Sequence, residues 1–153
     1  MVTGPPCPMG VGLDLLERTE LDRLFTRRWF LRYCYASEEI ERARELTGRR
    51  RQEYLAGRFA AKEAVLKALG RGLFQGIAPY DILVGRAPDG APRAELHGSA
   101  AAAAPGVSVL VSITHKGDAV AAVALTIPLG SPDAPERTGC GTAAGTCEER
   151  RAV

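Results

Sequence analysis

The stretch over residues 51–69 constrains the fold most, because its composition and its spacing both favour one long helix. Alanine, leucine, glutamate and lysine, which are strong helix formers, make up most of it. Its large apolar residues recur at helical intervals, at Leu55, Phe59, Leu66 and Leu69. Gly70 follows at a position where helices commonly end. The sequence therefore predicts a main helix over residues 51–69.

Several extended segments accompany this helix. In residues 10–15 apolar side chains alternate with glycines and Asp14, the period-two pattern of a strand with one buried face, and Asp14 projects away from that apolar side. Residues 107–114 also alternate, and a second extended run over 119–127 follows a short turn, so the two predict a hairpin with His115 where its first strand enters the turn. Residues 81–85 predict a further strand. The domain therefore combines helices with strands.

Shorter helices are predicted on both sides of the main one. Thr19 is a candidate cap for a helix over residues 20–25. Ser37, followed by two glutamates, has the N-cap and acidic first turn of a helix that runs to about residue 46. Residues 98–104 predict a short alanine-rich helix. Two short helices are thus expected before the main helix and one after it.

The length and composition predict one folded core. A chain of 153 residues rarely divides into two cores. We predict an irregular leader over residues 1–8, a folded domain over 9–128 and a flexible tail over 129–153, where aromatic residues are absent. No apolar run approaches the roughly 20 residues that cross a bilayer, and the first residues lack the pattern of a secretory signal. We therefore expect a cytoplasmic protein that does not bind a membrane.

The cysteine and glycine patterns disfavour several kinds of site. Four cysteines without a CxxC pair, and only two histidines, indicate neither a disulfide framework nor structural zinc. Gly70-Arg71-Gly72 has neither the dinucleotide-binding nor the P-loop spacing, and no GxSxG elbow is present. Rossmann, P-loop and covalent hydrolase chemistry are therefore disfavoured.

Positive charge is concentrated in one part of the chain. Residues 18–58 contain eleven arginines and seven acids, which gives +4 (11 − 7) within a chain of net charge +2. One interpretation is an anionic partner near this segment, and the other is a solvated helical surface with mixed ion pairs. The interleaved acids make nucleic acid the least favoured partner.

Asp14 and Glu63 are the carboxylates that a strand and the main helix can bring together. Two carboxylates without further dedicated ligands suit Mg²⁺, which keeps several waters and takes other oxygens from substrate phosphates. Lys67 follows Glu63 by four residues. The two therefore either form an exposed helical ion pair or face a substrate together, with Lys67 neutralising a phosphoryl group.

Two further features bear on phosphate binding. Arg58 and Lys62 are like charges four residues apart, which slightly opposes the helix unless an anion or an acid lies between them. His115 is either a satisfied polar residue at a turn or a general base or phosphate contact beside the flexible Gly117. The residues alone leave both readings of His115 open.

Three motifs resemble one known family. They are Gly10-Val11-Gly12-Leu13-Asp14, then Leu55-Ala56-Gly57-Arg58-Phe59-Ala60-Ala61-Lys62-Glu63-Ala64 with Lys67-Ala68 and Gly70, then Val111-Ser112-Ile113-Thr114-His115. In this order they resemble the holo-acyl-carrier-protein synthases, the small 4′-phosphopantetheinyl transferases. The resemblance implies an α+β fold in which an antiparallel sheet packs on a long helix, assembled as a homotrimer with the coenzyme site between neighbouring subunits.

The same resemblance implies a reaction and its catalytic residues. The 4′-phosphopantetheine arm of coenzyme A is transferred to a serine of an acyl carrier protein, adenosine 3′,5′-bisphosphate is released, and Mg²⁺ is required. Asp14 and Glu63 match the metal carboxylates, and Lys67 matches the lysine that contacts the pyrophosphate. His115 matches a position that lines the coenzyme site. These four residues are the catalytic candidates.

The resemblance also names residues that bind the two substrates. The coenzyme-binding candidates are Arg58, Lys62, Pro92 and His115, with Pro92 near the adenine. The carrier-binding candidates are Arg27, Arg28, Trp29 and Arg32, a basic and apolar patch suited to an acidic carrier. Glu20 departs from the family, which often has a basic residue there. The alternative is a catalytically idle module with the same fold that only docks carrier proteins.

Overall fold

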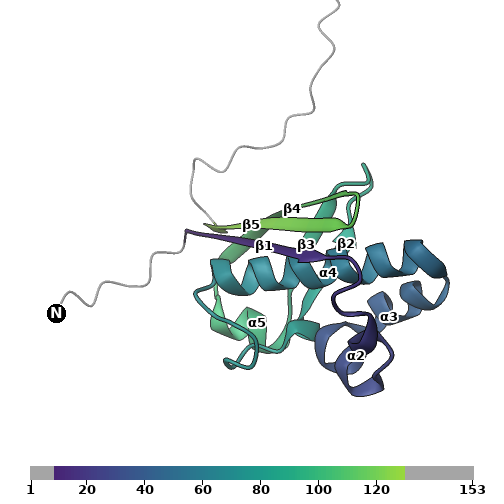
Figure 1. Ribbon diagram of the computed structural model, residues 1–153. Helices are drawn as coiled ribbons and strands as arrows, with labels where there is room; N and C mark the ends of the chain where they lie inside the picture. Colours follow the sequence, from purple (N-terminus) through teal and green to yellow (C-terminus); the bar gives the residue numbers. More distant parts are fainter. Residues whose placement is uncertain (1–8, 130–153) are drawn as a thin grey trace, which may run out of the picture.

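The computed structural model describes residues 9–129. The predicted leader over residues 1–8, and the predicted tail beyond residue 129, lie outside the described residues. Within them, a three-stranded antiparallel sheet lies across one long helix, as Figure 1 shows. The strands are β1 (Gly10–Glu17), β4 (Val107–Lys116) and β5 (Ala119–Pro128), in the order β1-β5-β4. The antiparallel sheet on a long helix is therefore confirmed.

The long helix, α4 (Gly48–Ala68), is the centre of the core. The prediction of a main helix is confirmed, with a start three residues earlier than expected. Its inward side chains are mostly small, and seven of them have no exposed surface: Leu55, Ala56, Ala60, Ala61, Ala64, Val65 and Leu66. Small side chains let the sheet approach the helix axis closely, so α4 supports all three strands of the sheet.

Strand β1 lies directly against the backbone of α4. A Cβ atom added to Gly10 would stand 2.0 Å from the carbonyl oxygen of Ala68, and one added to Gly12 would stand 1.9 Å from that of Ala64. Real side chains do not tolerate such distances, so only glycine fits at these two positions. The two glycines therefore set the distance between the sheet and the helix.

The apolar face of β1 was predicted to be buried, and this was wrong. Val11, Leu13 and Leu15 are 67%, 63% and 67% exposed, and they point away from α4. The glycine face, which also carries Asp14 and the buried Leu16, is the one that contacts the helix. The prediction that Asp14 projects away from the apolar side is confirmed. The physical reason is that close contact with a helix requires the smaller face of the strand.

Three short helices precede α4, where two were predicted. They are α1 (Asp22–Phe25), α2 (Arg28–Cys34) and α3 (Ser37–Arg44). Helix α2 was not anticipated as a separate element. Ser37 is the first residue of α3 instead of its cap, because Glu39 accepts a hydrogen bond from the Ala36 N–H at 2.9 Å. These helices enclose a second, largely aromatic cluster that includes Phe25, Phe30, Tyr35 and Leu55.

A smaller hairpin covers the other side of α4. It consists of β2 (Ile82–Arg86) and β3 (Pro92–Leu96), with the 3-10 turn η1 (Pro79–Asp81) before it and α5 (Gly98–Ala103) after it. The strand over 81–85 and the helix over 98–104 are confirmed, whereas β3 was not predicted. In the described part of the chain, no helix is both long and apolar enough to span a bilayer.

Candidate active site and nucleotide pocket

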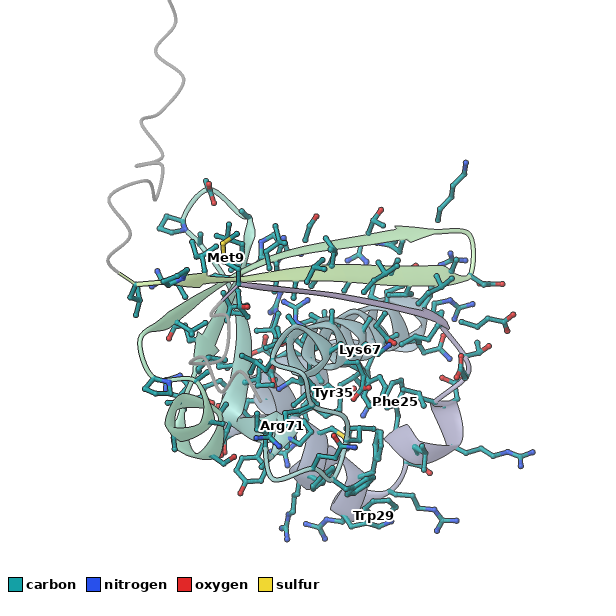
Figure 2. The ribbon with its side chains drawn as sticks, turned by 90° about the vertical axis from the view of Figure 1, so that its left-hand side faces the viewer. Met9, Phe25, Trp29, Tyr35, Lys67 and Arg71 are labelled. Carbon is teal, nitrogen blue, oxygen red and sulfur yellow. The ribbon has the colours of Figure 1, made fainter. Side chains whose placement is uncertain are left out.

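Strand β1 and helix α4 bring the two predicted metal carboxylates to one place. The Lys67 ammonium lies 2.8 Å from Asp14 Oδ1 and donates a second hydrogen bond to the carbonyl oxygen of Leu13 at 3.0 Å. Lys67 therefore joins α4 to β1, and Figure 2 shows it on the side of the helix beneath the strands. The expected helical ion pair between Glu63 and Lys67 is replaced by this contact across the two elements.

Glu63 is the least satisfied polar group of this cluster. Its Oε1 atom is buried and has no hydrogen-bond partner among the described residues. Burial raises the pKa of Glu63, the negative charge of Asp14 raises it further, and Lys67 opposes the shift. A buried carboxylate oxygen without a partner, next to a second carboxylate, is an environment that a bound cation would stabilise.

The donor set of this cluster fits Mg²⁺. No group of three or more histidine, cysteine, aspartate or glutamate side chains that could hold a metal occurs in residues 9–129. Among the described residues, Asp14 and Glu63 are therefore the two side chains that could ligate a metal at this point. Mg²⁺ is commonly bound by one or two carboxylates and completes its octahedron with water and substrate phosphate. Asp14 and Glu63 thus fit this ion better than one that needs an all-protein cage.

A pocket of about 630 Å³ lies on another part of α4, between α3, α4, the β2–β3 hairpin and β4. Its lining includes three residues predicted to bind the coenzyme: Arg58, Pro92 and His115. The structure thus brings together side chains from three distant segments. His115 is exposed at the end of β4, as the sequence predicted, and its imidazole contributes to the pocket wall.

Arg58 is a buried cation without a full set of partners. Its side chain is only 8% exposed, and its Nε atom has no hydrogen-bond partner among the described residues. The guanidinium lies 4.0 Å from the centre of the Tyr54 ring, which holds it in place. Burial lowers the pKa of Arg58, although an arginine keeps its charge. Such a group is poised to accept a negatively charged ligand.

Three further arginines of the pocket were not predicted from the sequence. They are Arg42 on α3, Arg50 on α4 and Arg86 on β2. No motif or spacing marks them, because they converge only when α3 and β2 fold against α4. The excess of arginine over residues 18–58 was the one available signal for Arg42 and Arg50, and it did not separate them from solvated positions. Arg86 lies outside that segment.

Lys62 does not reach the pocket, which corrects its predicted coenzyme contact. Its side chain is 1% exposed, and its ammonium forms an ion pair with Glu39 at 2.7 Å. It also donates to the carbonyl oxygens of Pro79 at 3.0 Å and Ile82 at 2.6 Å. These three contacts use all three ammonium hydrogens. The structure therefore gives Lys62 a structural role, in which Glu39 compensates its charge.

The predicted carrier-binding patch is on the surface. Arg27, Arg28, Trp29 and Arg32 are all exposed on or beside α2. Trp29 is 59% exposed, and Figure 2 shows it at the far side of the molecule from Met9. Glu20, the departure from the family pattern, is folded back and accepts a hydrogen bond from the Glu17 N–H at 3.2 Å.

Comparison with known proteins identifies the family. The family model described as "4'-phosphopantetheinyl transferase superfamily" matches residues 10–124, which is most of the chain. This chain belongs to the 4′-phosphopantetheinyl transferase superfamily. A holo-[acyl-carrier-protein] synthase from Nitratidesulfovibrio vulgaris (strain DP4) is 41% identical over 126 residues, which cover 76% of this chain and 96% of that protein. The family predicted from the three motifs is confirmed.

Solved structures of this superfamily include complexes with the coenzyme. A holo-(acyl-carrier-protein) synthase from Bacillus anthracis in complex with CoA (3′,5′-ADP) has a TM-score of 0.66 and 29% identity, over 76% of this chain and 94% of that chain. The Chronobacterium ammoniagenes ACPS-CoA complex has a TM-score of 0.67 and 27% identity, over 78% of this chain and 97% of that chain. The predictions of a transferase and of coenzyme A as its substrate are confirmed.

The shifted pKa of Glu63 predicts a pH-dependent effect of Glu63→Gln. A carboxyl whose pKa is raised on folding lowers stability once the pH exceeds its ordinary value of 4.5. Without divalent cations, Glu63→Gln is therefore expected to raise the free energy of unfolding at pH 7. This gain in stability should disappear well below pH 4.5, where Glu63 is protonated in both the folded and the unfolded protein. Urea denaturation at the two pH values measures it.

The matched control is Glu41→Gln, which changes an exposed glutamate on α3. It should leave the free energy of unfolding nearly unchanged at both pH values. A Glu63→Gln protein that is less stable than wild type at pH 7, or equally stabilised at both pH values, would contradict the assigned environment.

Proposed function

We propose that this protein is a Mg²⁺-dependent holo-acyl-carrier-protein synthase. It transfers 4′-phosphopantetheine from coenzyme A to a serine of an apo acyl carrier protein and releases adenosine 3′,5′-bisphosphate. The observation that carries the metal dependence is the buried Glu63 oxygen without a partner beside Asp14. A cytoplasmic location is part of the same proposal.

Asp14, Glu63 and Lys67, the acidic cluster, promote the transfer by positioning the substrate and by electrostatic stabilisation. Asp14 and Glu63 would hold Mg²⁺, which when bound supplies positive charge to the diphosphate oxygens. Lys67 is held at Asp14 by its 2.8 Å ion pair, so its ammonium is fixed where negative charge develops as the phosphoanhydride breaks. The cluster therefore favours attack on the β-phosphorus while the nucleotide leaves as an anion.

The arginine-lined pocket holds the nucleotide part of coenzyme A. Arg58 offers an unsatisfied buried Nε for a phosphate oxygen, and His115 and Pro92 line the same space. Arg42, Arg50 and Arg86 also line it, so that with Arg58 four arginines outnumber the three glutamates of the lining, Glu38, Glu39 and Glu53. This distribution matches a ligand that carries a 3′-phosphate in addition to its diphosphate.

The site is shared between subunits of a homotrimer. None of Asp14, Glu63 and Lys67 lines the pocket. Within one subunit, the acidic cluster and the pocket are therefore separate. The outward face of the sheet is apolar: Val11 pairs with Leu125 and Leu13 with Val123, and Leu125 also pairs with Leu110 of β4. A contiguous exposed apolar face of this kind marks a protein interface. Trimer formation would cover it and bring a neighbour's pocket to the acidic cluster.

Loss of either carboxylate is expected to stop the transfer. Asp14→Asn and Glu63→Gln should each slow loading of the carrier on the order of a hundredfold or more, because each removes a ligand of the proposed metal ion, whose positive charge would act on the reacting diphosphate. Mass spectrometry of an apo acyl carrier protein incubated with coenzyme A and Mg²⁺ measures the gain of the arm. Glu41→Gln is the control. Full activity of either variant would refute the metal assignment, and an unmodified carrier with the wild-type protein would refute the function.

The basic patch is expected to determine affinity for the carrier. Acidic carriers are attracted by Arg28 and Arg32, so Arg28→Glu combined with Arg32→Glu should raise KM for the carrier about tenfold or more. KM for coenzyme A should stay unchanged, because the patch lies outside the pocket. Arg44→Glu, on the exposed surface of α3, is the control. An unchanged carrier KM would exclude this docking surface.

Shared sites predict that two inactive variants complement each other. Asp14→Asn impairs the acidic cluster and Arg58→Gln impairs the pocket, so mixed trimers contain some sites with both halves intact. Random mixing of differently tagged subunits should restore about a quarter of all sites, and about a third of the sites in the trimers purified through both tags. Activity of the co-purified mixture measures this. If the mixture remains as inactive as its components, the site lies within one chain.

A further inference from the structure

The ion pair between Lys62 and Glu39 lies behind the wall of the pocket. Glu39 is only 2% exposed, yet it belongs to the residues that line the pocket. We propose that Lys62 is a positioning residue that neutralises the Glu39 carboxylate from its buried side, which leaves Arg58 free for the phosphate of the ligand. This inference rests on the proposal that the pocket holds the nucleotide of coenzyme A.

The contacts of Glu39 show how its charge is held. Its Oε2 atom lies 2.7 Å from the Lys62 ammonium and accepts a hydrogen bond from the Ala36 N–H at 2.9 Å. Its Oε1 atom accepts one from the Val84 N–H at 3.0 Å. Both carboxylate oxygens of Glu39 therefore already have hydrogen-bond or ion-pair partners in the protein. One carboxylate also links α3 to β2, two of the elements that line the pocket.

Lys62 is fixed equally firmly on its own side. Besides Glu39, its ammonium is bonded to the carbonyl oxygens of Pro79 and Ile82. It lies 5.6 Å from the centre of the Tyr35 ring, and the Tyr35 hydroxyl donates to the carbonyl oxygen of Leu55 at 2.9 Å. Lys62 cannot turn toward the pocket without breaking several buried contacts. Its charge thus acts on Glu39 and not on the ligand directly.

Because Glu39 pairs with Lys62, Arg58 is left without a carboxylate partner among the described residues and can bind the ligand. It precedes Lys62 by one helical turn. Burial lowers the pKa of Arg58, and the negative charge of Glu39 partly opposes this shift. Yet no Arg58–Glu39 ion pair occurs in the described residues, and Arg58 Nε is left without a partner. If Lys62 lost its charge, Glu39 would become an uncompensated buried anion in a pocket wall that it shares with Arg58. Glu39 would then compete with the ligand for Arg58.

Binding of adenosine 3′,5′-bisphosphate, measured by calorimetry on the full chain, tests this role. Lys62→Met should weaken binding about tenfold or more, because it leaves one negative charge in the pocket wall. Adding Glu39→Gln to Lys62→Met removes that charge and should restore the affinity to within about threefold of wild type. Glu39→Gln alone should bind at least as tightly as wild type, because it removes negative charge.

A purely structural role predicts a different pattern, since both single variants and the double variant would then weaken binding. Wild-type affinity of Lys62→Met, or a double variant as weak as Lys62→Met, would overturn the inference. If circular dichroism shows that Lys62→Met is unfolded, Glu39→Gln alone decides, and binding weaker than wild type by more than about threefold would overturn it.

Arg58→Gln separates this inference from the proposal on which it rests. Weaker binding by Arg58→Gln together with unchanged binding by Lys62→Met would overturn only the role of Lys62. Failure of the wild-type protein to bind the bisphosphate, or wild-type affinity of Arg58→Gln, would overturn the nucleotide pocket and the role of Lys62 with it.

Discussion

The contact between β1 and the backbone of α4 determines the rest of this structure. Gly10 and Gly12 admit the carbonyl oxygens of Ala68 and Ala64 into space that any side chain would fill. Because β1 lies so close, Asp14 meets Lys67 directly and stands within electrostatic range of Glu63. The same contact turns the large side chains of the strand outward. One steric constraint thus produces both the acidic cluster and the apolar face assigned to the subunit interface.

Buried charges are paired differently in the acidic cluster and in the pocket, which we propose are the two halves of one site. In the acidic cluster, Glu63 has an oxygen without a hydrogen-bond partner among the described residues and a raised pKa, which supports the proposal that it holds a cation. In the pocket wall, the charge of Glu39 is fully paired with Lys62, while the cation Arg58 is left incompletely bonded. An unsatisfied buried group is costly in a low dielectric and is commonly found where a ligand completes it. The two halves therefore present opposite charges, one suited to a metal and the other to phosphates.

The fold was predictable wherever local chemistry determines it. The spacing of Leu55, Phe59 and Leu66 correctly indicated α4, alternation indicated β1 and β4, and an extended run after the turn indicated β5. Helix α2 and strand β3 were missed because their sequences carry neither a cap nor a regular period, and tertiary packing supplies their stability. The acids of the site were recognised through motifs, whereas Arg42, Arg50 and Arg86 come from elements whose mutual position the sequence does not encode locally.

The sequence by itself determined the family, the main helix, the strands of the sheet and the candidate metal carboxylates. These follow from residue types at fixed spacings along one element. Only the tertiary structure decided which face of β1 is buried, that Lys62 pairs with Glu39 instead of facing the ligand, and which arginines line the pocket. Those outcomes depend on the distance between elements far apart in the chain. That distance is set by packing against the backbone of α4, which hydrophobic periodicity does not report.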